Sequence, residues 1–380
     1  MLLTIITFLV ILSLLALAHE WGHFITARKS GVKVEEFGIG LPPRMFGFRK
    51  GETVYSVNWL PLGGFCALKG EAGENAADKD SFSGKKIWRR AVILCGGVAM
   101  NMVLAAMLLS VGFFIGLPQV LNGNADQLRA KDVKIQVISV MKNSPAQTAD
   151  IAVGDIILEI DGQEFSEVEA IQNYIKAKEG PAALTLKRGG EELTKELTPR
   201  ILEPAQEDLP TGEKPVPQKL IGVGLVKTGI IPYPWYQAIW YGCKDTVTLT
   251  GRILVAFYDL FKDMIVKRQV STDISGPVGI AVMTGQVVHL GFSYVLQFAA
   301  ILSINLAILN LLPFPALDGG RLLFLVIEKV RRKPVDRKLE ATIHGIGYMI
   351  LLGLIALVTF RDIGKFGAKM LEALKNMLNL

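Results

Sequence analysis

The sequence predicts a polytopic α-helical membrane protein with four transmembrane helices, a membrane-associated β-hairpin region and one soluble α+β insert. Two observations predict this fold class. Of the 380 residues, 51% are hydrophobic and only 20% are charged, whereas soluble domains carry about 25% charged residues. The apolar residues also gather in four blocks instead of spreading along the chain. Together these features exclude an ordinary soluble enzyme, a disordered chain and a fibrous repeat.

The first predicted span covers residues 1–26. Met1–Ala18 consists almost wholly of Leu, Ile, Val, Phe and Ala, and with the residues that follow it is long enough to cross a hydrocarbon layer of about 30 Å. Ala16-Leu17-Ala18 resembles a signal-peptide cleavage site. However, a signal peptide starts with basic residues, and no Lys or Arg precedes Arg28. We therefore expect a retained span.

Three further spans are predicted at 91–117, 290–312 and 343–360. Loops rich in Lys and Arg stay in the cytoplasm. The segments 27–90 and 313–342 carry more basic than acidic residues, whereas the long stretch between the second and third spans is slightly acidic. We expect a multi-pass protein of the inner (plasma) membrane with the insert extracytoplasmic. The net charge of +6 then reflects orientation, and nucleic acid is not an expected partner.

The segment 27–90, on the cytoplasmic side, contains a predicted β-hairpin or re-entrant region. Glu36–Leu68 is rich in Gly, aromatic and β-branched residues, and Phe46–Val57 has the pattern of a hairpin. It is either an ordinary cytoplasmic hairpin or a sheet whose edge strand holds an unwound peptide by backbone pairing. Both interpretations remain open.

The insert at 118–228 is predicted to be an α+β domain. Its turn signals and alternating runs predict strands at 135–140, 155–160, 183–187 and 221–226, turns at Asp161-Gly162 and Gly189-Gly190, a helix at 170–178 and a flexible Pro-rich loop at 203–219. The run Asn143–Gly162, with its S-P-A…G-D-I-I…I-D-G pattern, resembles a bacterial PDZ domain over roughly residues 120–228. This resemblance implies capture of an extended peptide by strand addition. A steric plug that excludes folded substrates is an equally open interpretation.

The segment 229–289 is predicted to be amphipathic and to lie at the membrane surface. Its first part carries Trp235, Tyr236 and Trp240, and aromatic residues at this density suit the lipid headgroup zone. Charged residues such as Arg252 interrupt its apolar stretches. We therefore expect an interfacial anchor and not a fifth span.

Chemistry is predicted at His19-Glu20-Trp21-Gly22-His23, an H-E-x-x-H motif. Residues four apart share one face of a helix, so both imidazoles can reach one Zn²⁺ while Glu20 acts as general base. The three cysteines are far apart, so a metal here needs nitrogen and oxygen ligands. The alternative is a pair of interfacial histidines that reach toward water.

A catalytic zinc needs a third protein ligand. His289 and His344 qualify by element, but the predicted topology places His289 on the opposite side from His19. Asp318 is preferred, because the run Asn310–Gly320 ends an apolar segment with two prolines and two glycines that let a carboxylate turn inward. Its alternative role is the N-cap of a helix from 321 to 331. The first and third spans both run inward, so they bring His19 and Asp318 to the cytoplasmic face.

These motifs together resemble the site-2 protease family, and specifically the bacterial RseP-type intramembrane zinc proteases with one PDZ domain. The resemblance implies His19, His23 and Asp318 as zinc ligands and Glu20 as the catalytic base. It also implies that Asn310 binds substrate. Gly96–Asn101 resembles a second-span region of the family that assigns a substrate role to Asn101. Gly276–Ile280 resembles a further family run, for which only a structural role is expected. In family members, a sheet like the predicted hairpin dips into the membrane near the zinc.

The resemblance also implies the reaction and the partners. The chain would cleave single-span membrane proteins, of the anti-sigma-factor or remnant-signal-peptide type, in regulated intramembrane proteolysis. An upstream site-1-type protease would first trim the outer domain of the substrate, and the bilayer would surround the reaction.

Two other classes of function fit the sequence less well. A non-proteolytic PDZ-containing membrane scaffold would have no need of a base such as Glu20. A metal transporter would carry ionisable residues through several spans, and the second and fourth spans have almost none.

Overall fold

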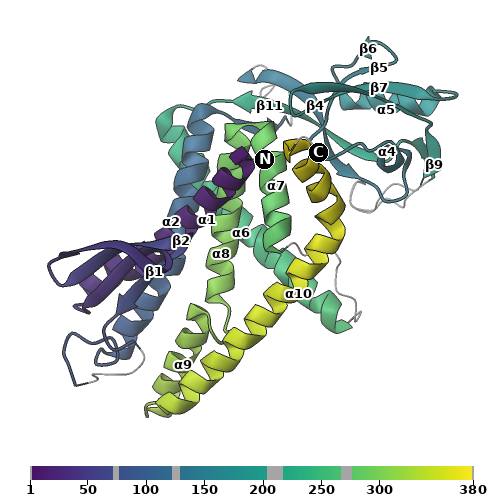
Figure 1. Cartoon of the computed structure of the whole chain (residues 1–380). Helices are drawn as coiled ribbons and strands as arrows, with labels where there is room; N and C mark the ends of the chain where they lie inside the picture. Colours follow the sequence, from purple (N-terminus) through teal and green to yellow (C-terminus); the bar gives the residue numbers. More distant parts are fainter. Residues whose placement is uncertain (1, 72–76, 122–128, 203–216, 267–275, 379–380) are drawn as a thin grey trace. The chain divides into compact units, whose positions relative to one another are not determined.

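The computed structural model describes residues 2–71, 77–121, 129–202, 217–266 and 276–378 (Figure 1). The chain forms two compact units. We call the unit made of Met1–Gly112, Pro234–Val288 and Val295–Leu380 the membrane unit. The second unit, Phe113–Tyr233 with His289–Tyr294, is called the PDZ-like unit.

Four helices are long and apolar enough to cross a membrane: α1 (Leu2–Lys29), α2 (Ile87–Ile115), α8 (Phe292–Leu311) and α10 (Arg337–Leu378, apolar over Arg337–Lys365). At 1.5 Å per residue, even 20 residues reach about 30 Å. Large apolar side chains on them stay uncovered by protein; Met349 is 68% exposed and Leu357 is 65% exposed. Lipid is the solvent that suits such a surface.

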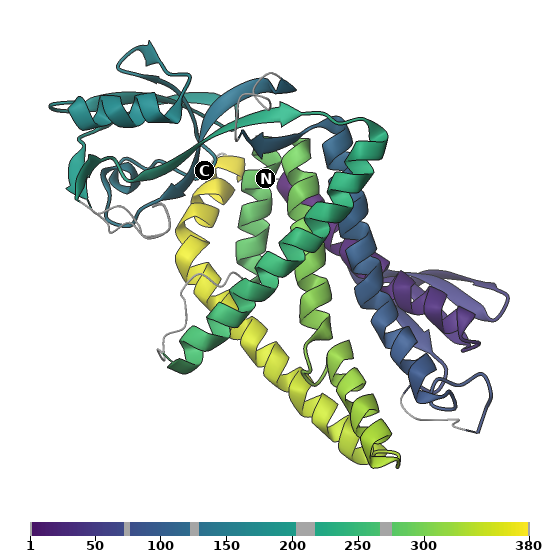
Figure 2. The same ribbon diagram turned by 180° about the vertical axis from the view of Figure 1, so that it is seen from behind.

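The helices α1, α2 and α8 pack against one another. Ile11 and Leu15 of α1, Leu104 of α2 and Ala299 of α8 form one buried cluster. The helix α6 (Trp235–Val266) crosses α2, as Figure 2 shows. Gly242 of α6 lies so close to α2 that an added Cβ would be 2.2 Å from Ser110 Oγ. A glycine is therefore required at this crossing.

The predicted interfacial segment 229–289 contains two helices among the described residues. After the end of a strand, β11 (Val223–Ile231), it forms α6, which packs on α2 while Trp235 and Trp240 remain exposed. Its last part is α7 (Pro277–Leu290), an apolar helix of 14 residues that is too short to span. Hydropathy merged these unlike helices into one segment. Residues 267–275 lie outside the described residues.

Two predicted boundaries also differ from the helices. The predicted third span began at 290, but α7 ends there and α8 begins at Phe292, after Gly291 at φ 119°. The predicted fourth span at 343–360 and the described part of the predicted C-terminal tail, 361–378, belong to one helix, α10, that runs to Leu378. The end of the apolar run at Phe360 does not end the helix, because the Arg and Lys residues that follow are good helix formers.

Asp362 of α10 caps the N-terminus of α7. Its Oδ2 accepts hydrogen bonds from the backbone N–H of Gly276 at 2.9 Å and of Gly279 at 2.7 Å, and the carboxylate is buried. A Cβ added at Gly276 would lie 2.6 Å from Val358. The run Gly276–Ile280 thus fastens α7 to α10.

We expect Asp362→Ala to destabilise the protein by about 1.5–3 kcal/mol, because the change removes hydrogen bonds to a charged acceptor at a helix N-terminus. The measurement is thermal unfolding of the detergent-solubilised chain. Asp259→Ala, at an exposed position on α6, is the control and should leave the unfolding temperature unchanged. Equal unfolding temperatures for the two variants would contradict the cap.

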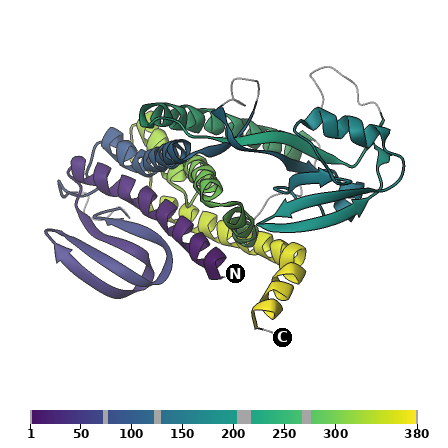
Figure 3. The same cartoon turned by 90° about the horizontal axis from the view of Figure 1, so that it is seen from above.

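The segment after α1 is a hairpin of β1 (Val34–Lys50) and β2 (Thr53–Leu68) that lies beside α1 (Figure 3). The strands fold back on themselves, since Glu36 pairs with both Val54 and Ala67. Gly40 (φ 78°) and Gly63 (φ 77°) take conformations that L-residues rarely adopt. The last part of β2, residues 64–68, is an edge with no second partner strand among the described residues.

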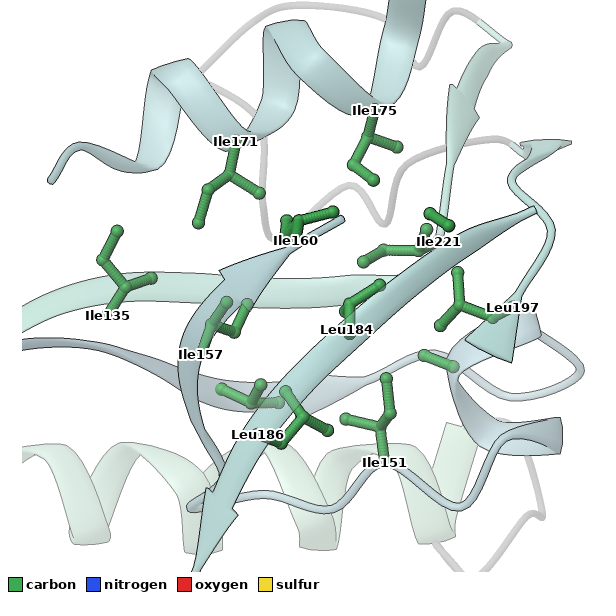
Figure 4. Close-up of a cluster of buried hydrophobic side chains, with 13 residues drawn as sticks. Ile135, Ile151, Ile157, Ile160, Ile171, Ile175, Leu184, Leu186, Leu197 and Ile221 are labelled. Atoms are coloured by element: carbon green, nitrogen blue, oxygen red, sulfur yellow. The ribbon is translucent and has the colours of Figure 1, made fainter. Parts of the chain in front are cut away.

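The PDZ-like unit holds a sheet in the order β3-β11-β4-β5-β7-β8, with β6 paired to β5. The strands are β3 (Leu117–Val120), β4 (Lys131–Val140), β5 (Ile156–Ile160), β6 (Gln163–Glu164), β7 (Ala182–Arg188), β8 (Glu191–Leu197) and β11 (Val223–Ile231). The helices are α4 (Pro145–Thr148) and α5 (Val168–Ala177). Figure 4 shows Ile171 and Ile175 of α5 pointing into the core with Ile160 and Leu184 of the sheet.

Most predicted elements of this unit are present. Both predicted turns have positive φ, 52° and 77° at Asp161-Gly162 and 58° and 102° at Gly189-Gly190, as two-residue hairpin turns require. Two predictions need correction. The end of the predicted loop, Gln218–Leu220, is strand β10, which pairs with β9 (Arg200–Leu202). The strand predicted at 221–226 is β11, which runs from Val223 to Ile231. Residues 203–216 of the predicted loop lie outside the described residues.

An ion pair with a buried carboxylate joins Asp155, the residue before β5, to Arg188 at the end of β7. Asp155 is 1% exposed, and its two carboxylate oxygens each accept a hydrogen bond from the Arg188 guanidinium at 2.7 Å. We expect Arg188→Met to destabilise the unit by about 3–5 kcal/mol, because the carboxylate is left buried without its partner charge. Hydrogen exchange of β5 and β7 amides in the full chain measures the loss. Lys187→Met, at an exposed neighbour on β7, is the control; equal protection in both variants would contradict the prediction.

Candidate metal centre

The helix α1 places His19 and His23 on one face, as their spacing of four residues requires. Both residues are only 8% exposed. Their Nε2 atoms lie 3.2 Å apart. Two imidazoles therefore point at one spot inside the membrane unit.

Asp318 arrives at the same spot from the far end of the chain. It is the first residue of α9 (Asp318–Arg331), and Leu317, not Asp318, is the N-cap. Asp318 is therefore not the N-cap of a helix that starts at 321, which was its predicted alternative role. The following glycines are required by the tight turn, because a Cβ at Gly319 would lie 2.1 Å from the Leu312 carbonyl oxygen and one at Gly320 would lie 2.3 Å from that of Phe314.

The three side chains form a compact donor triangle. Asp318 Oδ2 lies 3.0 Å from His19 Nε2 and 3.2 Å from His23 Nε2. A tetrahedral zinc at about 2.0–2.2 Å from its ligands separates the ligand atoms by about 3.3 Å. Asp318 Oδ2 is also buried and receives no hydrogen bond from any described residue. The donor set and its size fit Zn²⁺.

Comparison with known proteins agrees with this centre. The model of Peptidase family M50 matches residues 7–354. The chain belongs to peptidase family M50. This is the site-2 protease family, and with the donor triangle it makes the chain a zinc metalloprotease.

Relatives of this M50 peptidase cover nearly all of it. A Clostridium perfringens protein, named provisionally as a zinc metalloprotease, is 36% identical and aligns over 94% of this chain and 98% of its own. The zinc metalloprotease RasP of Geobacillus kaustophilus is 30% identical over 96% of this chain and 98% of its own. A solved PDZ domain of the SdrC-like protein of Listeria innocua covers 24% of this chain and 92% of its own, with 22% identity and a TM-score of 0.20.

Two further predicted residues of the M50 peptidase lie beside the triangle. Asn310, near the end of α8, is partly exposed, and its Nδ2 lies 3.5 Å from His19 Nε2. Glu20 is also partly exposed, and a Cβ at Gly64 of β2 would lie 3.8 Å from Glu20 Cγ. The end of β2 therefore lies beside the residue predicted to be the base.

Asn101 also lies beside His19, but it is enclosed by protein. Its side chain is fully buried, at 0% exposure, and its Nδ2 lies 3.4 Å from His19 Nδ1. A residue so enclosed faces a ligand of the metal centre and not an open surface.

The other candidate ligands do not join the triangle. Among the described residues the cluster able to hold a metal consists of His19, His23 and Asp318, without His289 or His344. His344 of α10 instead accepts a hydrogen bond at Nδ1 from the Ala316 N–H, at 2.9 Å. It therefore holds the loop that carries Asp318. In the sequence, His344 is a histidine at the start of a predicted span, and this position indicated only a candidate ligand.

A thiolate ligand is also unsupported. Burial, and then the nearby Glu20 and Glu71 carboxylates, raise the pKa of the Cys66 thiol above its usual range. Cys66 is also not part of the donor cluster that His19, His23 and Asp318 form among the described residues.

Proposed function

We propose that the chain is an intramembrane zinc endopeptidase that cleaves single-span membrane proteins within or near their transmembrane segment. The donor triangle carries the proposal, because it is formed by the apolar helix α1 and by the first residue of α9, shortly after the apolar helix α8. A hydrolytic centre in this setting acts on peptide bonds that ordinary proteases cannot reach.

The proposed roles follow from the chemistry of each side chain. The zinc, when bound, polarises the scissile carbonyl and lowers the pKa of water to about 7. Glu20 takes the proton of the attacking water and delivers it to the departing amide nitrogen. Asn310 holds the substrate backbone near the centre, as its partly exposed carboxamide beside His19 supports.

A substrate helix must unwind before cleavage, since its carbonyls are already hydrogen-bonded within the helix. The edge of β2 at 64–67 has no second partner strand among the described residues, and Gly64 lies next to Glu20. We propose that it pairs with the unwound segment by strand addition.

The proposed setting is the inner (plasma) membrane, with the metal centre near the cytoplasmic face and the PDZ-like unit extracytoplasmic. The excess of Lys and Arg in the segments 27–90 and 313–342 supports this orientation. The proposed substrates are of the anti-sigma-factor or remnant-signal-peptide type, trimmed beforehand by a site-1-type protease.

The test uses the purified full chain and a single-span reporter tagged at both ends, in detergent and in proteoliposomes. Mass spectrometry of the products locates the cut bond. We expect a cut within or next to the apolar segment. Cleavage confined to the soluble tags would overturn the proposed intramembrane activity.

A further inference from the structure

One face of α2 touches both imidazoles of the metal centre. The Ile93 carbonyl oxygen lies 2.9 Å from His23 Nδ1, and Asn101 Nδ2 lies 3.4 Å from His19 Nδ1. Gly97 lies midway, where an added Cβ would be 2.5 Å from His23 Nε2 and 2.6 Å from His19 Cε1. These positions are spaced by four residues, so they form one stripe along the helix.

The close approach of α1 and α2 depends on glycines. A Cβ at Gly22 would lie 2.1 Å from the Gly96 carbonyl oxygen, and one at Gly96 would lie 2.5 Å from Thr26 Oγ1. Small residues of this kind let helix backbones approach closely in membranes. The stripe on α2 can therefore act directly on the ring nitrogens that do not face the metal.

The proton on each ring decides what these contacts do. A histidine that binds zinc through Nε2 is neutral and carries its proton on Nδ1. In His23, this Nδ1–H donates a hydrogen bond to the Ile93 carbonyl oxygen. His19 needs a matching acceptor, and the Asn101 carboxamide is the group within reach.

Asn101 Oδ1 is the fitting acceptor. It is buried and has no hydrogen-bond partner among the described residues. The oxygen and nitrogen of a carboxamide have nearly the same shape, so their assignment follows from the hydrogen-bond network. With Oδ1 toward His19, the Nδ1–H gains its acceptor. Ser303 Oγ of α8 donates a hydrogen bond to the Asn101 backbone carbonyl oxygen at 2.8 Å, and not to the carboxamide.

We propose that Asn101 is a positioning residue of the metal centre: its Oδ1 accepts the Nδ1–H of His19 and fixes the tautomer and orientation of that ring. This inference deepens the proposed function and rests on its zinc site. It replaces the substrate role predicted for Asn101 from the sequence. Loss of such a partner typically weakens metal affinity 10–100-fold.

The experiment measures the zinc dissociation constant of the purified full chain by competition with a chromophoric chelator. All variants carry Glu20→Gln in addition, so the result does not depend on proteolysis. We expect Asn101→Leu, which has a similar size but no acceptor, to weaken zinc binding 10–100-fold. Asn101→Asp keeps an acceptor and should restore affinity to within a few-fold of the parent.

Ser303→Ala is the matched control, because it removes a hydrogen bond to the same residue without touching His19. Its zinc affinity should equal that of the parent. If Asn101→Leu does not fold, ¹⁵N spectra of histidine-labelled parent protein provide the second measurement, with a protected Nδ1–H expected on His19 in the zinc-loaded state.

Two outcomes would overturn the positioning role. One is parental zinc affinity in Asn101→Leu, and the other is a zinc-loaded His19 that carries its proton on Nε2. Asn101→Leu is also measured without the Glu20 substitution, at saturating zinc. A raised KM with unchanged zinc affinity would show that Asn101 binds substrate instead. If the parent protein bound no zinc at all, the metal centre itself would be refuted. That result differs from a failure of the Asn101 inference alone, in which the parent still binds zinc.

Discussion

Glu20→Gln is expected to lower the cleavage rate about 10²–10⁴-fold, because glutamine has the shape of glutamate but cannot take a proton from water. Zinc content should remain at the wild-type level, since Glu20 is not part of the donor triangle. The measurements are cleavage of the single-span reporter under single-turnover conditions and zinc content by elemental analysis.

The pairing of the two readouts makes this prediction specific. A variant that lost both activity and zinc would show that Glu20 supports the fold or the metal, and not proton transfer. Cleavage at the wild-type rate would remove Glu20 from the mechanism. Glu52→Gln, at an exposed position in the turn between β1 and β2, is the matched control and should cleave normally.

Asp318→Ala is expected to remove zinc and activity together. The carboxylate supplies the third corner of the donor triangle, at 3.0 and 3.2 Å from the two Nε2 atoms, and two imidazoles alone hold zinc weakly. The loss of affinity should exceed the 10–100-fold typical of residues that only support a ligand. Chelator competition and elemental analysis of the purified chain measure it.

Asp318→Asn separates charge from shape at the same position. It keeps an oxygen in place but removes the negative charge that suits Zn²⁺, so its zinc affinity should lie between those of Asp318→Ala and wild type. The control Asp259→Asn changes an exposed acid on α6 and should leave zinc bound. Unchanged zinc content in Asp318→Ala would refute the ligand assignment.

Sequence alone predicts the H-E-x-x-H residues of the site more directly than it predicts Asp318. His19, Glu20 and His23 lie within one helical turn of each other, so spacing predicts their common face. Asp318 lies 295 residues after His23 in the chain, and its prediction needed the topology of the spans and a resemblance to a family. The structure brings it to the imidazoles through a turn that depends on Gly319 and Gly320.

The role of Asn101 could not be read from the sequence, because it depends on which face of α2 meets α1. That face is set by glycine contacts between Gly22, Gly96 and Gly97, which hydropathy does not register. The contact of His344 could not be predicted for a similar reason, since its partner is a backbone N–H in the loop before α9. Contacts between elements decide both residues.

The fold shows the same division. Apolar length predicts four candidate spans, and the described helices include four of that length and composition. The separation of α7 from α8 depends on the conformation of Gly291, and the fold-back of β1 and β2 depends on Gly40 and Gly63. Single backbone angles of this kind leave little trace in a pattern of apolar and polar residues.

We propose that one zinc, held by His19, His23 and Asp318, supports hydrolysis in the membrane. The most direct test strips zinc from the purified wild-type chain, reconstitutes the chain with the single-span reporter, and measures the cleavage rate as zinc is returned. We expect no cleavage without zinc, and a cleavage rate that rises and saturates at one zinc per chain. Undiminished cleavage by the zinc-free chain would contradict it.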